Sequence, residues 1–366
     1  MQRTVKSVFH DPRNRLVAAI VLVVTSAGGL AATQGRSGSA RAGVIAGRVV
    51  DASNQPVPDV LVVPLWEIPS RHGKTIRPFD VRAGSTTNAN GEFRVEQLFA
   101  GSYYLVALPR NVPWGQPLPI NSDAYRFGYA ITYYPSATRL ADAKRIDVGD
   151  KPVTASAITM ASAHLAQITG VAIASNGQPA HGGRLGVAHG DHLFGVDSIA
   201  VPIRPDGSFV IVGVPPGTYH LHLREGQWPP PRDVIPKVSV AKVTVADGDV
   251  RRVRVMPVEM VKATGRVVLD ANQRSLLASG IRISSSPTDS DGNPGPQRGG
   301  MVRDDLTFEF RTWPGPGYVR VFVGRQEWTT KAVRLNGVSI GDRDIDFQSG
   351  REISGLEVEL GKPLTR

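Results

Sequence analysis

The stretch VPIRPDGSFVIVGVPPGTYHLHL, residues 201–223, decides the fold of this chain. Asp206-Gly207 has the residue types of a tight turn, because glycine adopts positive φ angles at no steric cost. A β-branched run begins at Phe209, and Pro215-Pro216-Gly217 predicts a second turn. The next segment alternates between one apolar face (Tyr219, Leu221, Leu223) and one polar face (His220, His222, Arg224). This period of two is typical of a half-buried strand, so the stretch predicts a hairpin-rich sheet unit.

The same pattern occurs three times along the 366 residues. Residues 86–108 read TTNANGEFRVEQLFAGSYYLVAL, and residues 301–323 read MVRDDLTFEFRTWPGPGYVRVFV. When the three stretches are aligned on their phenylalanines, a tyrosine follows ten residues later in each. Each copy is also preceded by an opening strand with a central glycine. These positions are Phe93, Phe209 and Phe308; Tyr103, Tyr219 and Tyr318; and Gly47, Gly170 and Gly265. A recurring spacing of this kind predicts three copies of one structural unit.

The third copy departs from the pattern at two points. Asp305-Leu306 stands where the other copies have Asn-Gly or Asp-Gly. The apolar residues Val319, Val321 and Val323 are out of phase with Tyr318. We therefore expect a β-bulge or a shifted register in the last hairpin of this copy.

Composition agrees with a protein built from strands and turns. Glycine (39 residues) and proline (28 residues) are both abundant, which favours frequent turns. No window has the 3.6-residue apolar period of a helix. Cysteine is absent, so disulfides, thiol catalysis and cysteine metal sites are excluded. The sequence predicts an all-β chain of three tandem seven-stranded, immunoglobulin-like β-sandwich domains after an N-terminal signal segment.

The N-terminus has the three parts of a secretory signal. A basic head with Arg3, Lys6, Arg13 and Arg15 precedes the apolar run LVAAIVLVV at residues 16–24, and small residues follow. The alternative is an uncleaved membrane anchor, although the apolar run is shorter than the ~20 residues that span a bilayer. The predicted organisation is a signal peptide or anchor (1–32), a linker (33–43), β-sandwich 1 with an aromatic insertion (44–162), β-sandwich 2 (163–259) and a divergent β-sandwich 3 (260–366).

The chain is basic, with a formal net charge of +10. Its lysines and arginines are scattered, with only short pairs such as Arg251-Arg252, whereas a nucleic-acid site needs a clustered basic patch. An exported protein also rarely meets nucleic acid. We therefore expect no nucleic-acid partner, and contact with a membrane only through a retained N-terminal segment. An extracytoplasmic location (periplasmic, secreted or cell-surface) is expected, with a polysaccharide or an envelope protein as partner.

Three segments of the first copy resemble the carboxypeptidase regulatory-like domain. They are GRVVDASNQPVPDV (47–60), TNANGEF (87–93) and LFAGSYYL (98–105). The resemblance covers most of residues 44–259 in two copies and the third copy more weakly. It implies a seven-stranded prealbumin-like (transthyretin-like) sandwich that is non-catalytic and occurs in secreted, periplasmic and surface proteins of bacteria. In that family the domain serves as a spacer, a docking module or a binding unit.

The segment that follows the first Phe–Tyr block is rich in aromatic residues. The candidate ligand-binding residues there are Trp114, Tyr125, Arg126, Tyr129, Tyr133 and Tyr134. Flat rings with hydrogen-bonding neighbours are surfaces on which sugars and extended peptides dock. The alternative is that Tyr125, Phe127 and Tyr129 form an alternating strand that covers the edge of the sandwich.

The second copy holds a cluster of histidines, with candidate metal ligands at His189, His192, His220 and His222. Imidazoles two residues apart on one strand could bind a zinc or copper ion from the same side. The alternative, which we favour, is that they face solvent from a half-buried strand, so no metal and no cofactor are expected.

These observations predict a non-enzymatic, exported protein that acts as a binding, adhesion or scaffold module at the bacterial cell envelope. The zinc motif His-Glu-x-x-His and the phosphate-binding motif Gly-x-x-x-x-Gly-Lys are both absent from the sequence. The alternative is a carbohydrate-binding, accessory or sensor component of an extracytoplasmic peptide- or glycan-processing system.

Overall fold

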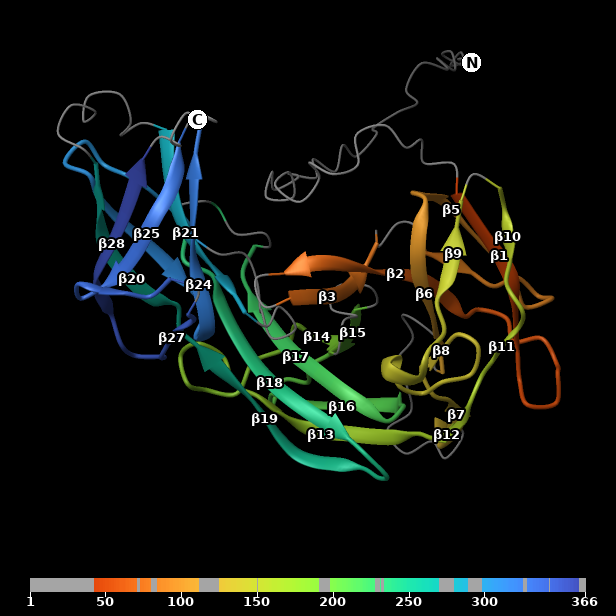
Figure 1. Cartoon of the computed structure of the whole chain (residues 1–366). Coiled ribbons are helices and arrows are strands. Elements are labelled where there is room, and N and C mark those ends of the chain that lie inside the picture. The colour runs from red at the N-terminus through yellow and green to blue at the C-terminus, as the bar shows by residue number, and fades with distance from the viewer. Residues whose placement is uncertain are drawn as a thin grey trace, which may run out of the picture. The chain divides into compact units, whose positions relative to one another are not determined.

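The chain is nearly all β in the computed structural model (Figure 1), which confirms the predicted fold class. The structure describes residues 43–70, 73–79, 84–111, 125–149, 151–190, 198–227, 231, 234–269, 280–288, 298–324, 328–341 and 343–361. They belong to one compact unit, Ala40–Arg366. The predicted signal segment and linker lie outside these ranges, apart from Gly43. Within them, no helix is long and apolar enough to cross a membrane.

The strands of the first copy build two sheets. One contains β1 (Gly43–Val50), β5 (Glu92–Leu98), β10 (Val153–Thr154) and β11 (Ile158–Thr159). The other contains β2 (Leu61–Ser70), β3 (Gly73–Pro78), β4 (Ser85–Thr86), β6 (Gly101–Leu108), β8 (Thr132–Tyr133) and β9 (Ile146–Val148). A separate ribbon pairs β7 (Phe127–Tyr129) with β12 (Ser162–His164), and one 3-10 turn, η3, spans Leu140–Asp142.

The second copy has seven strands, as predicted. They are β13 (Ala166–Ala172), β14 (Arg184–His189), β15 (Ser198–Pro202), β16 (Ser208–Val214), β17 (Gly217–Glu225), β18 (Lys237–Val245) and β19 (Val250–Val258). One sheet runs β15-β14-β17-β18, and the other joins β13 to β16 and β19. The first residues of β18 also pair with the last residues of β19.

The third copy also has two sheets, but with nine described strands, two more than the seven predicted. One sheet has the order β23 (Thr307–Thr312), β20 (Val261–Val268), β28 (Ile353–Gly361), β25 (Thr329–Leu335) and β26 (Val338–Ser339). The other has the order β22 (Gly300–Met301), β21 (Ile281–Pro287), β24 (Gly315–Val323) and β27 (Ile345–Phe347).

Each copy encloses a hydrophobic core between its two sheets. In the second copy, Ile168 and Phe209 from one sheet lie in the same buried cluster as Leu221 from the other. The first and third copies have separate clusters, which contain Phe93 and Phe308 respectively. Apolar faces buried between paired sheets are the defining feature of a β-sandwich.

The glycine of each opening strand lies directly opposite the aligned phenylalanine. The cross-strand partners are Gly47 with Phe93, Gly170 with Phe209 and Gly265 with Phe308. A Cβ atom on Gly170 would meet the carbonyl oxygen of Val253 at 2.0 Å and the Phe209 ring at 2.9 Å. The glycine thus makes room both for the ring and for a neighbouring strand, because the ladder between β13 and β19 is bulged at this level. This packing explains why glycine and phenylalanine recur together.

The turn before each phenylalanine also has one geometry. Gly91, Gly207 and Leu306 all have positive φ angles, of 73°, 80° and 65°. In each turn the N–H of this residue donates to a carbonyl three residues earlier, as from Gly207 to Arg204. Leu306 therefore adopts the backbone conformation of glycine at the same position, which conserves the turn despite the changed residue.

The predicted register change in the third copy is confirmed. Val319, Val321 and Val323 pack against the third core, whereas Tyr318 is only half-buried. In the first two copies the tyrosine is buried, and its hydroxyl donates to a carbonyl four residues earlier (Tyr103 to Phe99, 2.9 Å; Tyr219 to Pro215, 2.8 Å). A shift of one residue moves a strand's side chains to the other face of the sheet.

Few residues separate the three sandwiches: the ribbon strand β12 lies between the first and the second, and no strand lies between the second and the third. Only Leu165 separates β12 from β13, and only Glu259 and Met260 separate β19 from β20. Leu165 and Met260 are buried, and Met260 packs with Val238 and Trp313 in a small cluster of its own. The links are thus anchored by apolar packing.

Thr87 is a buried polar residue whose replacement should destabilise the first sandwich. Its Oγ1 donates to the Val57 carbonyl and accepts from the Val60 N–H, both at 2.9 Å. We expect Thr87→Val to cost about 1–3 kcal/mol of unfolding free energy, because it leaves two buried backbone groups without their partner. The exposed Thr86→Val is the matched control, with an expected effect within about 0.5 kcal/mol. Equal effects in urea titrations of the two variants would contradict this assignment.

Candidate functional site

The aromatic segment forms a small ribbon beside the first sandwich. Gly128 and Ala163 are central partners in the antiparallel pairing of β7 with β12. The Asn111 amide covers the other edge of β7, since its Nδ2 donates to the Tyr129 carbonyl and its Oδ1 accepts from the Tyr129 N–H. Phe127 is 78% exposed, and its ring meets the His164 ring edge-on, with ring centroids 5.5 Å apart. The predicted strand is therefore confirmed only over Phe127–Tyr129: Tyr125 lies before β7, and Phe127 does not cover the sandwich edge.

The candidate ligand-binding tyrosines are not gathered on one open surface. Tyr133 is buried in a cluster with Val63 and Leu65. Tyr129 and Tyr134 pack against the core of the first sandwich, and the Tyr134 hydroxyl is 2.8 Å from Ser156 Oγ. Tyr125 is half-buried, and Trp114 lies outside the described residues. Ligand binding by these residues stays a prediction.

Arg126 joins the aromatic segment to the second sandwich. Its Nη1 and Nη2 donate to the two carboxylate oxygens of Asp249 at 2.5 and 3.3 Å. Asp249 also accepts from the Gln167 N–H at 2.9 Å. The hydrogen bond from Arg126 is the main reason that the pKa of Asp249 lies below its ordinary value. Arg126 therefore has a structural partner 123 residues away in sequence.

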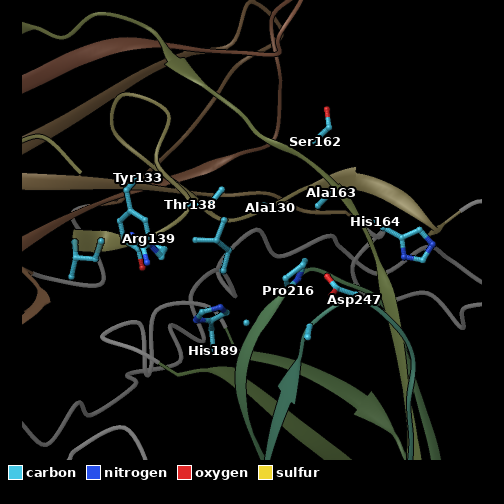
Figure 2. A pocket seen from close by; sticks show the side chains of 14 residues that line it. Ala130, Tyr133, Thr138, Arg139, Ser162, Ala163, His164, His189, Pro216 and Asp247 are labelled. Atoms are coloured by element: carbon cyan, nitrogen blue, oxygen red, sulfur yellow. The ribbon is translucent and has the colours of Figure 1, made fainter. Parts of the chain in front are cut away.

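A pocket of about 670 Å³ lies next to this junction (Figure 2). Its polar lining residues are Tyr133, Thr138, Arg139, Ser162, His164, His189 and Asp247. The volume is within the range of about 300–1,000 Å³ that is usual for small-molecule sites. Figure 2 shows the His164 and His189 rings well separated along the pocket wall.

Two polar side chains of this pocket, His189 and Arg139, already have structural contacts. His189 Nδ1 donates to the Gly190 carbonyl at 2.8 Å, and its ring lies edge-on to Tyr219. Arg139 donates through Nε and Nη2 to Asp142. A bound ligand would therefore replace or share these contacts. The arrangement offers donors and acceptors for a polar ligand, but it has no nucleophile next to a base among the described lining residues.

The candidate metal ligands do not converge. His189 lies opposite Tyr219 in the ladder between β14 and β17, so its ring is on the Tyr219 face. His220 and His222 are on the other face of β17. No group of three metal-ligating side chains occurs within the described ranges, and His192 is outside them. Metal binding therefore stays untested for the full set.

His222 is buried, so the prediction that it faces solvent is wrong. It is 7% exposed, and its ring occupies the space where a side chain on Gly186 would be. Burial is the main cause that lowers its pKa to about 4, with smaller contributions from Arg224 and His220. The alternation of apolar and polar residues correctly placed His222 on the face of β17 opposite Tyr219. It could not show that His222 is buried on that face too.

Because the His222 imidazole is buried, we expect the free energy of unfolding to decrease in acid. The pKa of His222 is about 4 in the folded protein against 6.5 ordinarily, so the unfolded chain binds the proton first as pH falls. Stability should be complete above pH 6.5 and decrease between pH 6.5 and 4, by about 3 kcal/mol in total. Thermal melts at pH 7 and pH 4.5 should show a smaller pH dependence for His222→Gln. The same pH dependence in both proteins would refute the assignment.

The sequence analysis missed two short motifs that resemble catalytic ones. His222-Leu223-Arg224-Glu225 matches His-x-x-Glu, and Gly337-Val338-Ser339-Ile340-Gly341 matches Gly-x-Ser-x-Gly. The first lies on β17, where residues three apart point to opposite faces, and Glu225 is bound to Ser175. The second lies in the hairpin between β25 and β26, whereas a nucleophile elbow needs a strand-to-helix turn. Neither motif therefore has the side-chain geometry that a zinc site or a nucleophile elbow requires.

Comparisons with known proteins yield only remote structural similarity. No protein-family model matches the chain, and no curated protein does. Among solved structures, the Bacillus anthracis TIE protein is 10% identical (88% of this chain, 51% of that chain, TM-score 0.21). A Streptococcal ancillary pilin is 11% identical (88% and 99%, TM-score 0.24), and a minor pilin of Streptococcus agalactiae is 14% identical (58% and 94%, TM-score 0.25). The chain thus spans about half the length of the first of these proteins. Scores of this size support no inference about function.

Proposed function

We propose that this chain is a non-enzymatic, exported binding and scaffold protein of the bacterial cell envelope. The observation that carries the proposal is the way in which the repeats are joined. Three sandwiches, each with its own core, follow one another closely: the ribbon strand β12 and Leu165 lead into the second sandwich, and two residues separate β19 from β20. A series of closely linked sandwiches keeps binding surfaces on neighbouring units close together, which suits a scaffold.

The packing of the aromatic segment also favours a scaffold role. Tyr129, Tyr133 and Tyr134 are used to complete the first sandwich, and Arg126 is used to hold Asp249 of the second. These residue types could have formed a ligand platform, but here the tyrosines pack within the first sandwich, and Arg126 joins this segment to the second. No described feature favours the carbohydrate-binding alternative at these rings.

Export is proposed from the N-terminal sequence, which lies outside the described residues. The absence of cysteine is compatible with either side of the membrane, so the location depends on the basic head and apolar run alone. The three folded units would then be presented outside the cytoplasm, either released or tethered by a retained segment.

Cell fractionation of a bacterium that produces the full chain tests the location. We expect the chain in the extracytoplasmic or membrane fraction, where added protease reaches it after the outer layers are opened. A variant with Ile20→Arg and Leu22→Arg interrupts the apolar run and should remain in the cytoplasm. A cytoplasmic location of the unmodified chain would contradict the proposal. N-terminal sequencing of the exported protein distinguishes a cleaved signal from a retained anchor.

A further inference from the structure

Strand β19 carries three exposed arginines within four residues, Arg251, Arg252 and Arg254. We call these residues the β19 arginine strip. β19 lies beside β13, and β13 lies beside β16 (Figure 1), so the strip runs along one sheet of the second sandwich. Arg252 and Arg254 have no carboxylate within ion-pair distance among the described residues. Arg251 is 3.5 Å from Asp249, which Arg126 already binds.

The third sandwich provides an internal comparison for these positions. Gly170 pairs with Val253 as Gly265 pairs with Leu356, so Arg254 corresponds to Glu357. In the third sandwich, Glu357 forms an ion pair with Arg266 on the neighbouring strand (2.5 Å). In the second sandwich the position of Arg266 is held by Val171, which leaves Arg254 opposite an apolar residue. The fold therefore does not require an uncompensated charge here.

Arg252 occupies a backbone position that favours glycine. It has a φ of 59° at the bulge in β19, and its counterpart in the third sandwich is Gly355, with a φ of 76°. A residue with a Cβ atom is strained in this left-handed region, whereas glycine is not. No described ion pair of Arg252 offsets this cost, so the local structure does not account for an arginine at this site.

A fourth guanidinium lies on the same face. Ser208 and Arg254 are both cross-strand partners of Val171, so they share one face of the sheet. The Arg204 guanidinium is 3.3 Å from Ser208 Oγ, about two strand spacings, or ~10 Å, from the Arg254 position. Of the nearby acids, Asp249 is held by Arg126, and Asp206, which accepts from the Ser208 N–H, offsets at most one of the four guanidinium charges. The face therefore has a net positive charge.

We propose that the β19 arginine strip and Arg204 form a binding surface for an acidic polysaccharide. Guanidinium groups bind carboxylate and sulfate groups with two parallel hydrogen bonds, so three of them within four residues of one strand suit a linear polymer with repeated acidic groups. A membrane surface fits less well, because Met256 is the one exposed large apolar residue that the described part of β19 contributes. The choice of an envelope polymer rests on the proposed function.

Binding of the purified full chain to polygalacturonate, measured by calorimetry at ~0.15 M salt, tests the proposal. We expect Arg252→Gly with Arg254→Gln to weaken binding at least tenfold. The matched control is Arg343→Gln with Arg351→Gln, which removes two exposed charges from the third sandwich and should change the affinity less than twofold. Because glycine is the residue that the third sandwich has at this bulge, the first variant should melt no lower than the unmodified chain.

Three outcomes would overturn the proposal. They are no binding by the unmodified chain, an equal loss of affinity in both double variants, and equal or tighter binding to double-stranded DNA or to phosphatidylglycerol vesicles. The first two show that the strip is not a site, and the third assigns it to a different polyanion. All three are measured on purified protein, so they are independent of the fractionation experiment that tests export.

Discussion

Phe209→Ala should destabilise the second sandwich by about 3–5 kcal/mol, which is the usual cost of removing a fully buried aromatic ring. The Phe209 ring is 1% exposed and lies across the strand pair from Gly170. Its removal leaves a cavity that the glycine cannot fill, because glycine has no side chain to move into the space. The same argument applies to Phe93 and Phe308, which are opposite Gly47 and Gly265.

Phe127→Ala is the matched control for this variant, since Phe127 is 78% exposed. The same atoms are removed, but little buried surface is lost, so the expected change is within about 0.5 kcal/mol. Urea unfolding followed by circular dichroism and by proteolysis measures both. Similar stabilities of the two variants would mean that the repeated phenylalanine is not a core residue.

Gly265→Ala should be the second most damaging of these substitutions. An added Cβ atom would be 2.2 Å from the Leu356 carbonyl oxygen and 2.6 Å from the Phe308 ring. β20 is held between β23 and β28, so relief requires that one of its neighbours move. We expect a loss of about 1–3 kcal/mol or more, the usual cost of inserting a group into a packed core.

Gly248→Ala is the control for the glycine variant, because no atom lies within 4 Å of the added Cβ. It should be neutral or slightly stabilising, since alanine restricts the unfolded chain. Thermal melts of the two variants give the comparison. An unchanged melting temperature for Gly265→Ala would show that β20 and β28 are not as close as the fold requires.

The all-β fold could be predicted because its determinants are local in sequence. Turn residues such as Asp206-Gly207 and the alternation after Pro216 act over a few residues, so their spacing is visible without a structure. The register change at Tyr318 was predictable for the same reason. The glycine of the opening strand was recognised as recurrent, but its cause, a close approach of Phe209 and Val253, depends on residues far apart in sequence.

The candidate site was less predictable than the fold. Nothing in the sequence relates Arg126 to Asp249, which are 123 residues apart. Alternation placed His222 on the polar face of its strand, but burial of that face depends on contacts between elements. The strained backbone of Arg252 could not be seen either, because the bulge became apparent only from the pairing of β13 with β19.

The central claim is that three repeated Gly–Phe pairs build three sandwiches, each with its own core. Hydrogen exchange with mass spectrometry on Phe93→Ala, Phe209→Ala and Phe308→Ala tests it most directly, because exchange reports local unfolding along the chain. We predict that each variant loses protection mainly in the strands of its own repeat, β1–β11, β13–β19 or β20–β28. Equal loss of protection across all three repeats in any one variant would show a single merged core and would contradict the account.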